Sequence, residues 1–452
     1  MKRLVFCFDG SWNRLNADCP TNVVLIAESV RPTAKDGTVQ IVFYDEGVGT
    51  GKLDKLRGGM FGVGLLTNLR EAYRFLIFNY EPGDEIFIFG FSRGAFTARS
   101  FAGFIRHVGI LDINSASKID RALSLYEAAM GKDGDDHPRT MQFRASYSSK
   151  VCVSDHDEQW RCENLDGYKA GSAPVLMIKY VGVWDTVGAL GIPNVLPFAE
   201  WLNRRRGFHD VKLTSKVQSA RHALAIDERR KLFRPTTWNN VAELNARCGA
   251  DHYDSEAPYH QRWFPGVHGA VGGGGKDRKL SDQALSWILS GARRSGLEIN
   301  SGVTSRIHET SPDRTGALQN EHDRPWHDRS VPGVVKRWIM NADREGPLET
   351  NDVSAFAKWR FYADAEVLPE KALYRPPTLS EVASELEKDR PPMLDIEVKS
   401  VGSYEVQKGD DLPKIAGAVM GDASLAGVLF AANRDLIDDP REIHPGWVLR
   451  IP

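Results

Sequence analysis

The stretch that decides the fold is EIFIFGFSRGAF, residues 85–96, in which a short apolar run leads directly into Gly-x-Ser-x-Gly. This order predicts a β-strand that ends at Ser92 and a helix from Ala95 to Val108. The flanking glycines, Gly90 and Gly94, permit a turn so sharp that bulkier neighbours would collide. The pattern is typical of a nucleophile elbow, which exposes a serine hydroxyl at the carboxyl end of a strand. The alternative is a Gly-Ser turn without chemistry.

Apolar and amphipathic segments alternate along the first part of the chain. Strands are predicted at residues 4–8, 38–44 and 175–184, and helices at 22–30 and 65–79. Repeated units of this kind, with strands that are apolar throughout, predict the α/β class: an α/β-hydrolase-like, mostly parallel sheet with helices on both faces. Because ligands of such sheets bind outside the carboxyl ends of the strands, polar residues there mark the expected site. They are Asp9, Asp45, Ser92 and Asp185.

The composition is that of a globular protein with one large and one small domain. The 452 residues are 42% apolar and carry a formal net charge of −2, so no nucleic-acid-binding face is indicated. The first apolar run stops at Asp9 without a cleavage site, and we expect a buried strand there, not a signal peptide. No segment approaches the roughly 20 apolar residues that span a bilayer.

The cysteines and histidines argue against a disulfide framework and against a metal site. Five scattered cysteines without a C-x-x-C motif indicate reduced thiols and a cytoplasmic location, unless a dedicated secretion machine exports the chain. Acidic and imidazole side chains gather at residues 251–268, but their spacing fits no compact pair of metal ligands. We therefore expect no metal and no other cofactor.

A serine hydroxyl alone is a weak nucleophile and needs a histidine base and an acid that orients the base. In α/β-hydrolases the acid and then the base follow the serine along the chain. Asp185 directly follows the strand at 175–184 and is the expected acid, unless it is only a turn residue or helix cap. Among twelve histidines, His268 is the expected base, because its glycine-rich loop lets the backbone approach the serine.

Three other histidines compete for the role of base. His222 lies in ARHALA, a run with helical character, and His252 and His260 lie in the polar stretch before His268. A histidine in a loop is by default a solvated side chain, so position alone does not separate these candidates.

Six separated motifs occur within residues 1 to 287. They are FDGSWN at 8–13, GVGT at 47–50, GFSRGA at 90–95, GVWDTVG at 182–188, ARHALAIDERR at 220–230 and FPGVH at 264–268. In this order they resemble a bacterial α/β-hydrolase family that includes type VI secretion phospholipase effectors. The resemblance implies a Ser-Asp-His triad at Ser92, Asp185 and His268. The chain has Ser11 where the family usually has threonine, and Gly269-Ala270 where it usually has Ser-Asp, so a group that could orient the loop is missing.

Asp9, Gly10 and Arg93 are candidates for oxyanion or substrate binding. Arg93 follows the serine, and its backbone N–H is the expected first oxyanion donor; the backbone after the first strand, at Asp9-Gly10-Ser11, could supply the second. The alternative for Asp9 is that it only caps a turn. The Arg93 side chain could meet an anionic head group or tie neighbouring loops together.

The chain changes character after residue 370. Residues 371–400 hold two Arg-Pro-Pro motifs and are expected to form an extended linker with one short helix, at 379–388. The hydrolase domain is thus predicted at 1–370 and a separate module at 401–452. Between residues 112 and 173 the chain is polar, which indicates either an insertion beside the site or a surface excursion.

The pattern of residues 401–452 predicts a strand, two helices and a strand. The segment resembles a LysM domain, most clearly in Asn433-Arg434 and in PGWVLRIP at 445–452. The resemblance implies binding of N-acetylglucosamine-containing glycans such as peptidoglycan in a shallow groove between two loops. The residues implied are Gly409, Asp410, Asp411, Ile443 and Pro445, with Asp411 standing where threonine is usual. The alternative is a protein-docking module that has lost sugar binding.

Together these features predict a serine esterase of the lipase or phospholipase type with a glycan-binding tail. The expected substrate is a lipid or a small ester, cleaved by acyl transfer through Ser92. Two alternatives come from other classes. One is a catalytically silent hydrolase fold that acts as a wall-binding or scaffold protein; the other is a cell-wall amidase delivered by the tail.

Overall fold

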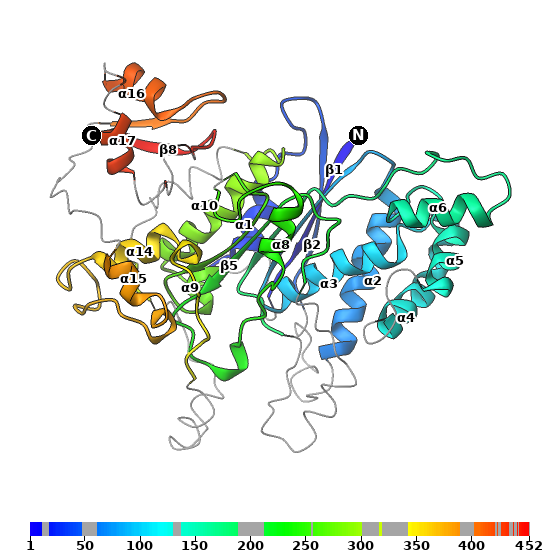
Figure 1. Ribbon diagram of the computed structural model, residues 1–452, viewed down its shortest axis with the longest axis horizontal. Helices are drawn as coiled ribbons and strands as arrows, with labels where there is room; N and C mark the ends of the chain where they lie inside the picture. The colour runs from blue at the N-terminus through cyan, green and yellow to red at the C-terminus, as the bar shows by residue number, and fades with distance from the viewer. Residues whose placement is uncertain are drawn as a thin grey trace.

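The computed structural model describes residues 1–10, 18–47, 61–129, 137–188, 212–254, 256–300, 316–318, 342–388, 402–420, 423, 426–433, 437, 441 and 443–451. The first part of the chain forms a six-stranded sheet of order β2-β1-β3-β4-β5-β6 (Figure 1). Its strands are β1 (Lys2–Phe8), β2 (Val39–Asp45), β3 (Glu85–Phe91), β4 (Tyr180–Trp184), β5 (Ala220–Ala225) and β6 (Tyr259–Phe264). Every neighbouring pair is parallel, which confirms the predicted α/β class.

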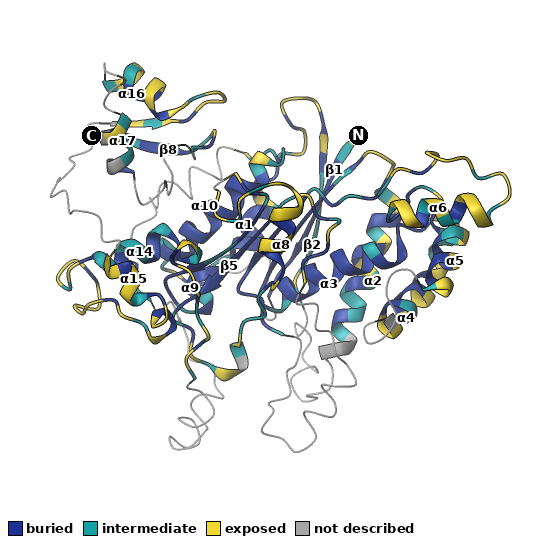
Figure 2. Cartoon of the chain, in the orientation of Figure 1, coloured by how far each residue is buried: buried dark blue, intermediate teal, exposed yellow. Residues whose placement is uncertain are grey.

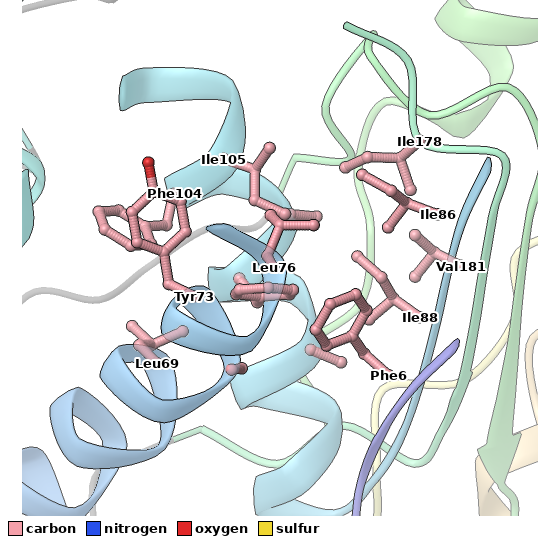
Figure 3. Close-up of a cluster of buried hydrophobic side chains, with 14 of the residues drawn as sticks. Phe6, Leu69, Tyr73, Leu76, Ile86, Ile88, Phe104, Ile105, Ile178 and Val181 are labelled. Carbon is pink, nitrogen blue, oxygen red and sulfur yellow. The ribbon is translucent and has the colours of Figure 1, made fainter. Parts of the chain in front are cut away.

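Helices cover both faces of this sheet. One face packs against α2 (Phe61–Asn79) and α3 (Arg93–Val108), and the other against α1 (Asn22–Ser29) and α10 (Lys279–Arg294). Alternate residues of β1 and β3 enter the two layers, which is why these strands are apolar throughout. Figure 3 shows the first layer, where the rings of Tyr73 and Phe104 lie 4.6 Å apart between centroids. In Figure 2 the inner strands β1, β3, β4 and β5 are accordingly largely buried, whereas the edge strand β2 is mostly half-buried.

The polar stretch between residues 112 and 173 forms a helical pack on the outside of α2 and α3. It consists of η2 (Ile113–Lys118), α4 (Ile119–Ala129), α5 (Pro138–Tyr147) and α6 (Asp155–Asn164). Its polar contacts with α3 include the bonds from Tyr126 to the carbonyl of Ser100 and from Arg144 to the carbonyl of His107. These contacts lie along the second half of α3, away from Ser92. Of the two alternatives, the structure favours the surface excursion.

Two predicted elements differ from the structure. The strand expected at 175–184 begins only at Tyr180, since Val175 and Ile178 form isolated bridges with Cys152 and Val217. The helical character assigned to the run around His222 is wrong, because that run is β5, paired on both sides within the sheet. Alanine and leucine favour helices in isolation, but the fully buried central position of β5 overrides that preference.

The prediction of an extended linker from residue 371 is wrong in its first half. Residues up to 388 form η5 (Pro377–Leu379) and α15 (Ala383–Lys388), which pack with η4 (Thr350–Asp352) and α14 (Ala355–Tyr362) beside β6. Leu379, Val382 and Leu386 are buried there, and Thr378 donates a hydrogen bond to the carbonyl of Ile226 at 2.8 Å. The residues predicted as the second half of the linker, 389–400, lie outside the described residues.

The last part of the chain has the predicted order of a strand, two helices and a strand. Strands β7 (Gly402–Glu405) and β8 (Val448–Ile451) pair antiparallel, and α16 (Leu412–Met420) and α17 (Ala426–Ala432) lie between them in sequence. These elements enclose a hydrophobic cluster of their own, which includes Leu412, Leu429 and Leu449. His444 meets Arg294 of α10 at 2.7 Å between Nε2 and Nη2, so the tail contacts the larger unit. In the described part of the chain, no helix combines the length and apolar character needed to cross a bilayer.

Candidate active site

Ser92 lies in the sharp turn between β3 and α3. Its φ of 60° places it in the left-handed region, which a non-glycine residue seldom adopts. The turn is possible because both flanking residues are glycines: a Cβ on Gly90 would lie 2.5 Å from the carbonyl oxygen of Gly94, and one on Gly94 would collide with the carbonyl oxygens of Phe8 and Asp9. The predicted strand, turn and helix are therefore all present around Ser92.

Asp185 directly follows β4, the strand next to β3. Its backbone N–H donates to the carbonyl of Ala223 at 2.7 Å, and its φ of 38° turns the chain sharply at this point. The side chain is fully buried and accepts a hydrogen bond from the backbone N–H of Ala225 at 3.0 Å. The alternatives of a turn residue or helix cap do not account for this buried carboxylate.

His268 begins the short helix α9 (His268–Gly272), which follows β6. The centroid of its imidazole ring lies 4.7 Å from the centroid of the Phe91 ring and 4.7 Å from that of the Phe233 ring. Glycine at 272 leaves room for this packing, since a Cβ there would collide with the ring of Phe91. Gly272 thus lets the imidazole approach Phe91 at the end of β3.

The three side chains form one chain of hydrogen bonds. Ser92 Oγ lies 2.8 Å from His268 Nε2, and His268 Nδ1 lies 2.5 Å from Asp185 Oδ2. The residues come from the carboxyl ends of three strands and are 83 and 176 positions apart in sequence. With the Nδ1 proton held by the carboxylate, Nε2 is free to accept the serine proton. The geometry is that required to activate a serine hydroxyl.

Arg344 is a site residue that sequence reasoning missed. Its Nη1 and Nη2 donate to Asp185 Oδ1 and Oδ2 at 2.6 and 2.9 Å, and its side chain is 2% exposed. Burial alone would raise the pKa of Asp185, but the Arg344 guanidinium, followed by His268, outweighs burial and holds that pKa well below its ordinary value. Arg344 belongs to no motif and lies 159 residues from Asp185, so no local signal marked it.

Glu228 fixes the backbone of the histidine loop. Its Oε2 accepts the N–H of His268 at 3.2 Å, and the carboxylate pairs with Arg230 at 2.7 Å. Burial opposes ionisation, but the hydrogen bond from Arg230 lowers the pKa of Glu228. Glu228 therefore supplies a group that orients the loop, where the aspartate usual after the histidine is replaced by alanine.

The candidates for oxyanion binding, Asp9, Gly10 and Arg93, differ in their surroundings. The N–H of Asp9 donates to the carbonyl of Asp45 at 2.9 Å, and that of Gly10 to the Asp9 carboxylate at 2.6 Å. The same carboxylate accepts from Thr21 and Tyr44, so Asp9 ties three segments together, which is a wider structural role than the turn cap of the alternative. Arg93 opens α3 directly after Ser92, so the helix begins before Ala95, where the sequence predicts its start. Burial lowers the pKa of Arg93 to about 10, which leaves the side chain cationic at neutral pH.

The competing histidines lie elsewhere. His222 is fully buried, with Nε2 3.1 Å from Thr186 Oγ1 and Nδ1 3.0 Å from Gln261 Oε1. Burial, together with the Arg99 guanidinium, lowers the pKa of His222 to about 3, so this ring stays neutral and supports the backbone after Asp185. His252 Nδ1 meets the amide of Asn245 at 3.0 Å, and His260 lies within β6.

The glycan-binding candidates lie on two loops of the tail. Asp410 accepts from Tyr404 and from the backbone of Gln407, and Asp411 accepts from the backbone of Lys414 at 2.7 Å. Gly409, Asp411 and Pro445 are exposed, and Ile443 is half-buried. The polar bonds here are local ones, of the kind that shape a turn and a helix start.

Comparison with known proteins identifies a family for the larger unit. The family model described as "T6SS, Phospholipase effector Tle1-like, catalytic domain" matches residues 2–291. Uncharacterized protein YEL023C of Saccharomyces cerevisiae is 27% identical over 248 residues, which are 52% of this chain and 32% of that protein. Potassium binding protein Kbp of Escherichia coli O6:H1 is 45% identical over 49 residues, 11% of this chain and 33% of that protein. The chain thus spans about a third of the length of these curated relatives.

Two solved structures share a distant likeness. An uncharacterized protein from Pseudomonas aeruginosa has 15% identity and a TM-score of 0.40, over 98% of this chain and 64% of that one. The Tle1 effector bound to the VgrG spike of the type 6 secretion system has 18% identity and a TM-score of 0.30, over 60% of this chain and 51% of that one.

Proposed function

Because this chain belongs to the family of Tle1-like phospholipase effectors of the type VI secretion system, we propose that it is a serine hydrolase that cleaves carboxylic esters of lipids. The observation that carries this proposal is the chain of hydrogen bonds from Ser92 through His268 to Asp185 at the carboxyl edge of the sheet. Lipid esters, and phospholipids among them, are the substrate class that the family indicates.

In the proposed reaction, His268 Nε2 takes the proton of Ser92 as the serine oxygen attacks the ester carbonyl carbon. Asp185 stabilises the imidazolium that forms, without itself taking the proton. The carbonyl oxygen becomes an oxyanion near the amino end of α3, where the N–H of Arg93 and the helix dipole favour negative charge. His268 then returns the proton to the leaving alcohol, and water, activated in the same way, releases the acid from Ser92.

Phe91 and Phe233 contribute by packing against the imidazole, Phe91 at an interplanar angle of 31° and Phe233 in a T-shaped contact at 64°. A ring held in this way keeps Nε2 in line with Ser92 through the catalytic cycle, so little reorganisation is needed when the proton moves. Arg93 directly follows Ser92 and is cationic at neutral pH, so we propose its side chain as the group that pairs with a phosphodiester head group, which would favour phospholipids over neutral esters.

The tail, residues 401–452, is proposed to be a LysM-like module that binds N-acetylglucosamine-containing glycans such as peptidoglycan. Support comes from the order of β7, α16, α17 and β8 and from a hydrophobic cluster separate from that of the sheet. In this proposal the hydrolase unit extends to residue 388, and the module holds it near a glycan surface. Family membership further supports export by the type VI machine, with cytoplasmic residence as the alternative.

Substrate turnover tests the proposal. Phospholipid vesicles, short-chain nitrophenyl esters and peptidoglycan fragments are each incubated with the wild type and with Ser92→Ala. We expect release of fatty acid and of nitrophenol by the wild type only. Cleavage of peptidoglycan without ester turnover would favour the amidase alternative, and no turnover of any substrate would favour a silent scaffold.

A further inference from the structure

We infer that Arg344 is a positioning residue for the serine site: it clamps the Asp185 carboxylate in the orientation that holds His268 in line with Ser92. This inference rests on the proposed serine-hydrolase function. Arg344 lies outside residues 2–291, the part matched by the family model, so the inference adds to the catalytic site one residue from beyond that part of the chain.

The first step concerns the hydrogen bonds that the two oxygens of the Asp185 carboxylate accept. Asp185 Oδ1 accepts from Arg344 Nη1 at 2.6 Å and from the Ala225 N–H at 3.0 Å. Asp185 Oδ2 accepts from Arg344 Nη2 at 2.9 Å and from His268 Nδ1 at 2.5 Å. The planar guanidinium spans both oxygens and thereby fixes rotation of the carboxylate about its last bond. The direction of the bond to His268 is set as a result.

The second step is the anchoring of Arg344 itself. Nη1 also donates to the carbonyl of Ala225 at 2.7 Å, and Nη2 to the carbonyl of Phe233 at 2.6 Å. Ala225 is the last residue of β5. Phe233 is the last residue of η3 (Lys231–Phe233), and the ring of Phe233 packs against His268. Nearby, the N–H of Ala342 donates to the carbonyl of Arg229 at 2.9 Å. The guanidinium is therefore held by the same elements that position the base.

The third step is electrostatic. Arg344 is the charged side chain that pairs with Asp185, and His268 donates a hydrogen bond to the same carboxylate; His222 is neutral, and Glu228 bonds to the backbone of His268. Without Arg344, burial is opposed by the hydrogen bonds from His268 and from the Ala225 N–H, and the pKa of Asp185 rises. A carboxyl that takes up a proton as the pH falls no longer stabilises the imidazolium. The acid limb of the activity profile should then move to higher pH.

The competing explanation is that Arg344 only holds the segment 342–388 against the sheet. Loss of such a structural contact lowers folding stability but leaves the pH profile and kcat of the folded protein unchanged. Thr378→Val is a matched control, because it removes the hydrogen bond of the same segment to the carbonyl of Ile226 without contact to Asp185.

The experiment measures kcat, KM and the pH profile of short-chain ester hydrolysis for the full-length wild type, Arg344→Met, Arg344→Lys, Thr378→Val and Ser92→Ala. For Arg344→Met we expect kcat to fall roughly 10- to 100-fold, KM to change little and the acid limb to move to higher pH. Arg344→Lys keeps the charge but loses the pair of guanidinium nitrogens that donates to both carboxylate oxygens. Its kcat should therefore fall while its acid limb stays in place. Thr378→Val should match the wild type in kcat and in its acid limb.

A double variant isolates the path of the effect. If Arg344 acts through Asp185, then adding Arg344→Met to Asp185→Asn should lower kcat little further, because the two residues act as one unit. Wild-type kcat and acid limb in Arg344→Met, or a full additional loss in the double variant, would overturn the inference. Should Arg344→Met not fold, a wild-type kcat in Arg344→Lys would overturn it instead. Full activity in Ser92→Ala would overturn the proposed function itself, which is a different result from any of these.

Discussion

The candidate residues at the sheet edge and those in the tail differ in burial and in how far along the sequence their bonded partners lie. At the sheet edge Ser92, Asp185 and His268 are buried and bond to one another across 83 and 176 positions of sequence. In the tail Asp410 and Asp411 lie at or near the surface and bond to residues 3 to 6 positions away. Burying a carboxylate costs free energy unless it is fully paired, so such convergence is typical of a working site. Local bonds at a turn need no function to explain them.

The largest expected effect is at the serine of the buried set. Ser92→Ala removes the oxygen that forms the acyl-enzyme, and a methyl group fits the elbow without strain beyond that of the native turn. Turnover of short-chain esters should fall by roughly 10⁴- to 10⁶-fold. Thermal unfolding, measured alongside, should show a folded protein with a midpoint close to that of the wild type. Wild-type turnover in this variant would remove the distinction between the two regions.

Asp185→Asn is expected to lower kcat roughly 10⁴-fold. The amide stabilises the wrong tautomer of the imidazole, and because it is neutral it does not stabilise the imidazolium. The same change also leaves Arg344 without its anionic partner, so the free energy of unfolding should fall as well. A kinetic assay on the folded fraction separates the two effects. His222→Gln, at the buried histidine that bonds Thr186, serves as the comparison and should lower kcat far less.

The end of the hydrolase unit offers a sharper test of where the two regions divide. A chain that ends at residue 373 lacks the buried Leu379, Val382 and Leu386 and should be insoluble or inactive. A chain that ends at residue 388 keeps this packing and should hydrolyse short-chain esters as fast as the full chain. Equal activity in both shortened chains would contradict the role given to residues 374–388.

Removal of the tail should affect retention and not chemistry. The chain that ends at residue 388 is expected to lose binding to insoluble peptidoglycan in a sedimentation assay, since tethering raises the effective concentration only at the wall. Asp411→Ala in the full chain serves as the finer probe of the loop that holds the predicted glycan residues. If both shortened and full chains sediment equally with peptidoglycan, the tail is not the glycan-binding module.

The smallest expected effect is at Glu228. Glu228→Gln keeps an acceptor for the N–H of His268 but loses the charge that pairs with Arg230, so kcat should fall by about tenfold or less. Glu243→Gln, at a pair that is exposed to solvent, is the control and should leave kcat unchanged. A loss as large as that in Asp185→Asn would mean that Glu228 takes part in the chemistry more directly.

The parts of the site that depend on neighbouring residues could be predicted from the sequence, and the contacts between distant segments could not. The strand, turn and helix around Ser92 are encoded within a few residues, as is the glycine-rich loop of His268, and both could be predicted because steric limits act over that range. Arg344 could not be predicted, since its pairing with Asp185 depends on how a distant segment packs beside β6. The residues around His222 favour a helix but form a strand for the same reason: burial between two strands outweighs the preference of these residues.

The most direct test of the central claim is covalent labelling of the serine. A fluorophosphonate reacts only with a serine whose proton is taken by a neighbouring base, so the wild type should be labelled and mass spectrometry should place the adduct on the peptide that carries Ser92. Ser92→Ala should show no adduct, and His268→Ala should be labelled far more slowly while remaining folded. An unlabelled wild type, or an adduct on another residue at undiminished rate in Ser92→Ala, would contradict the account.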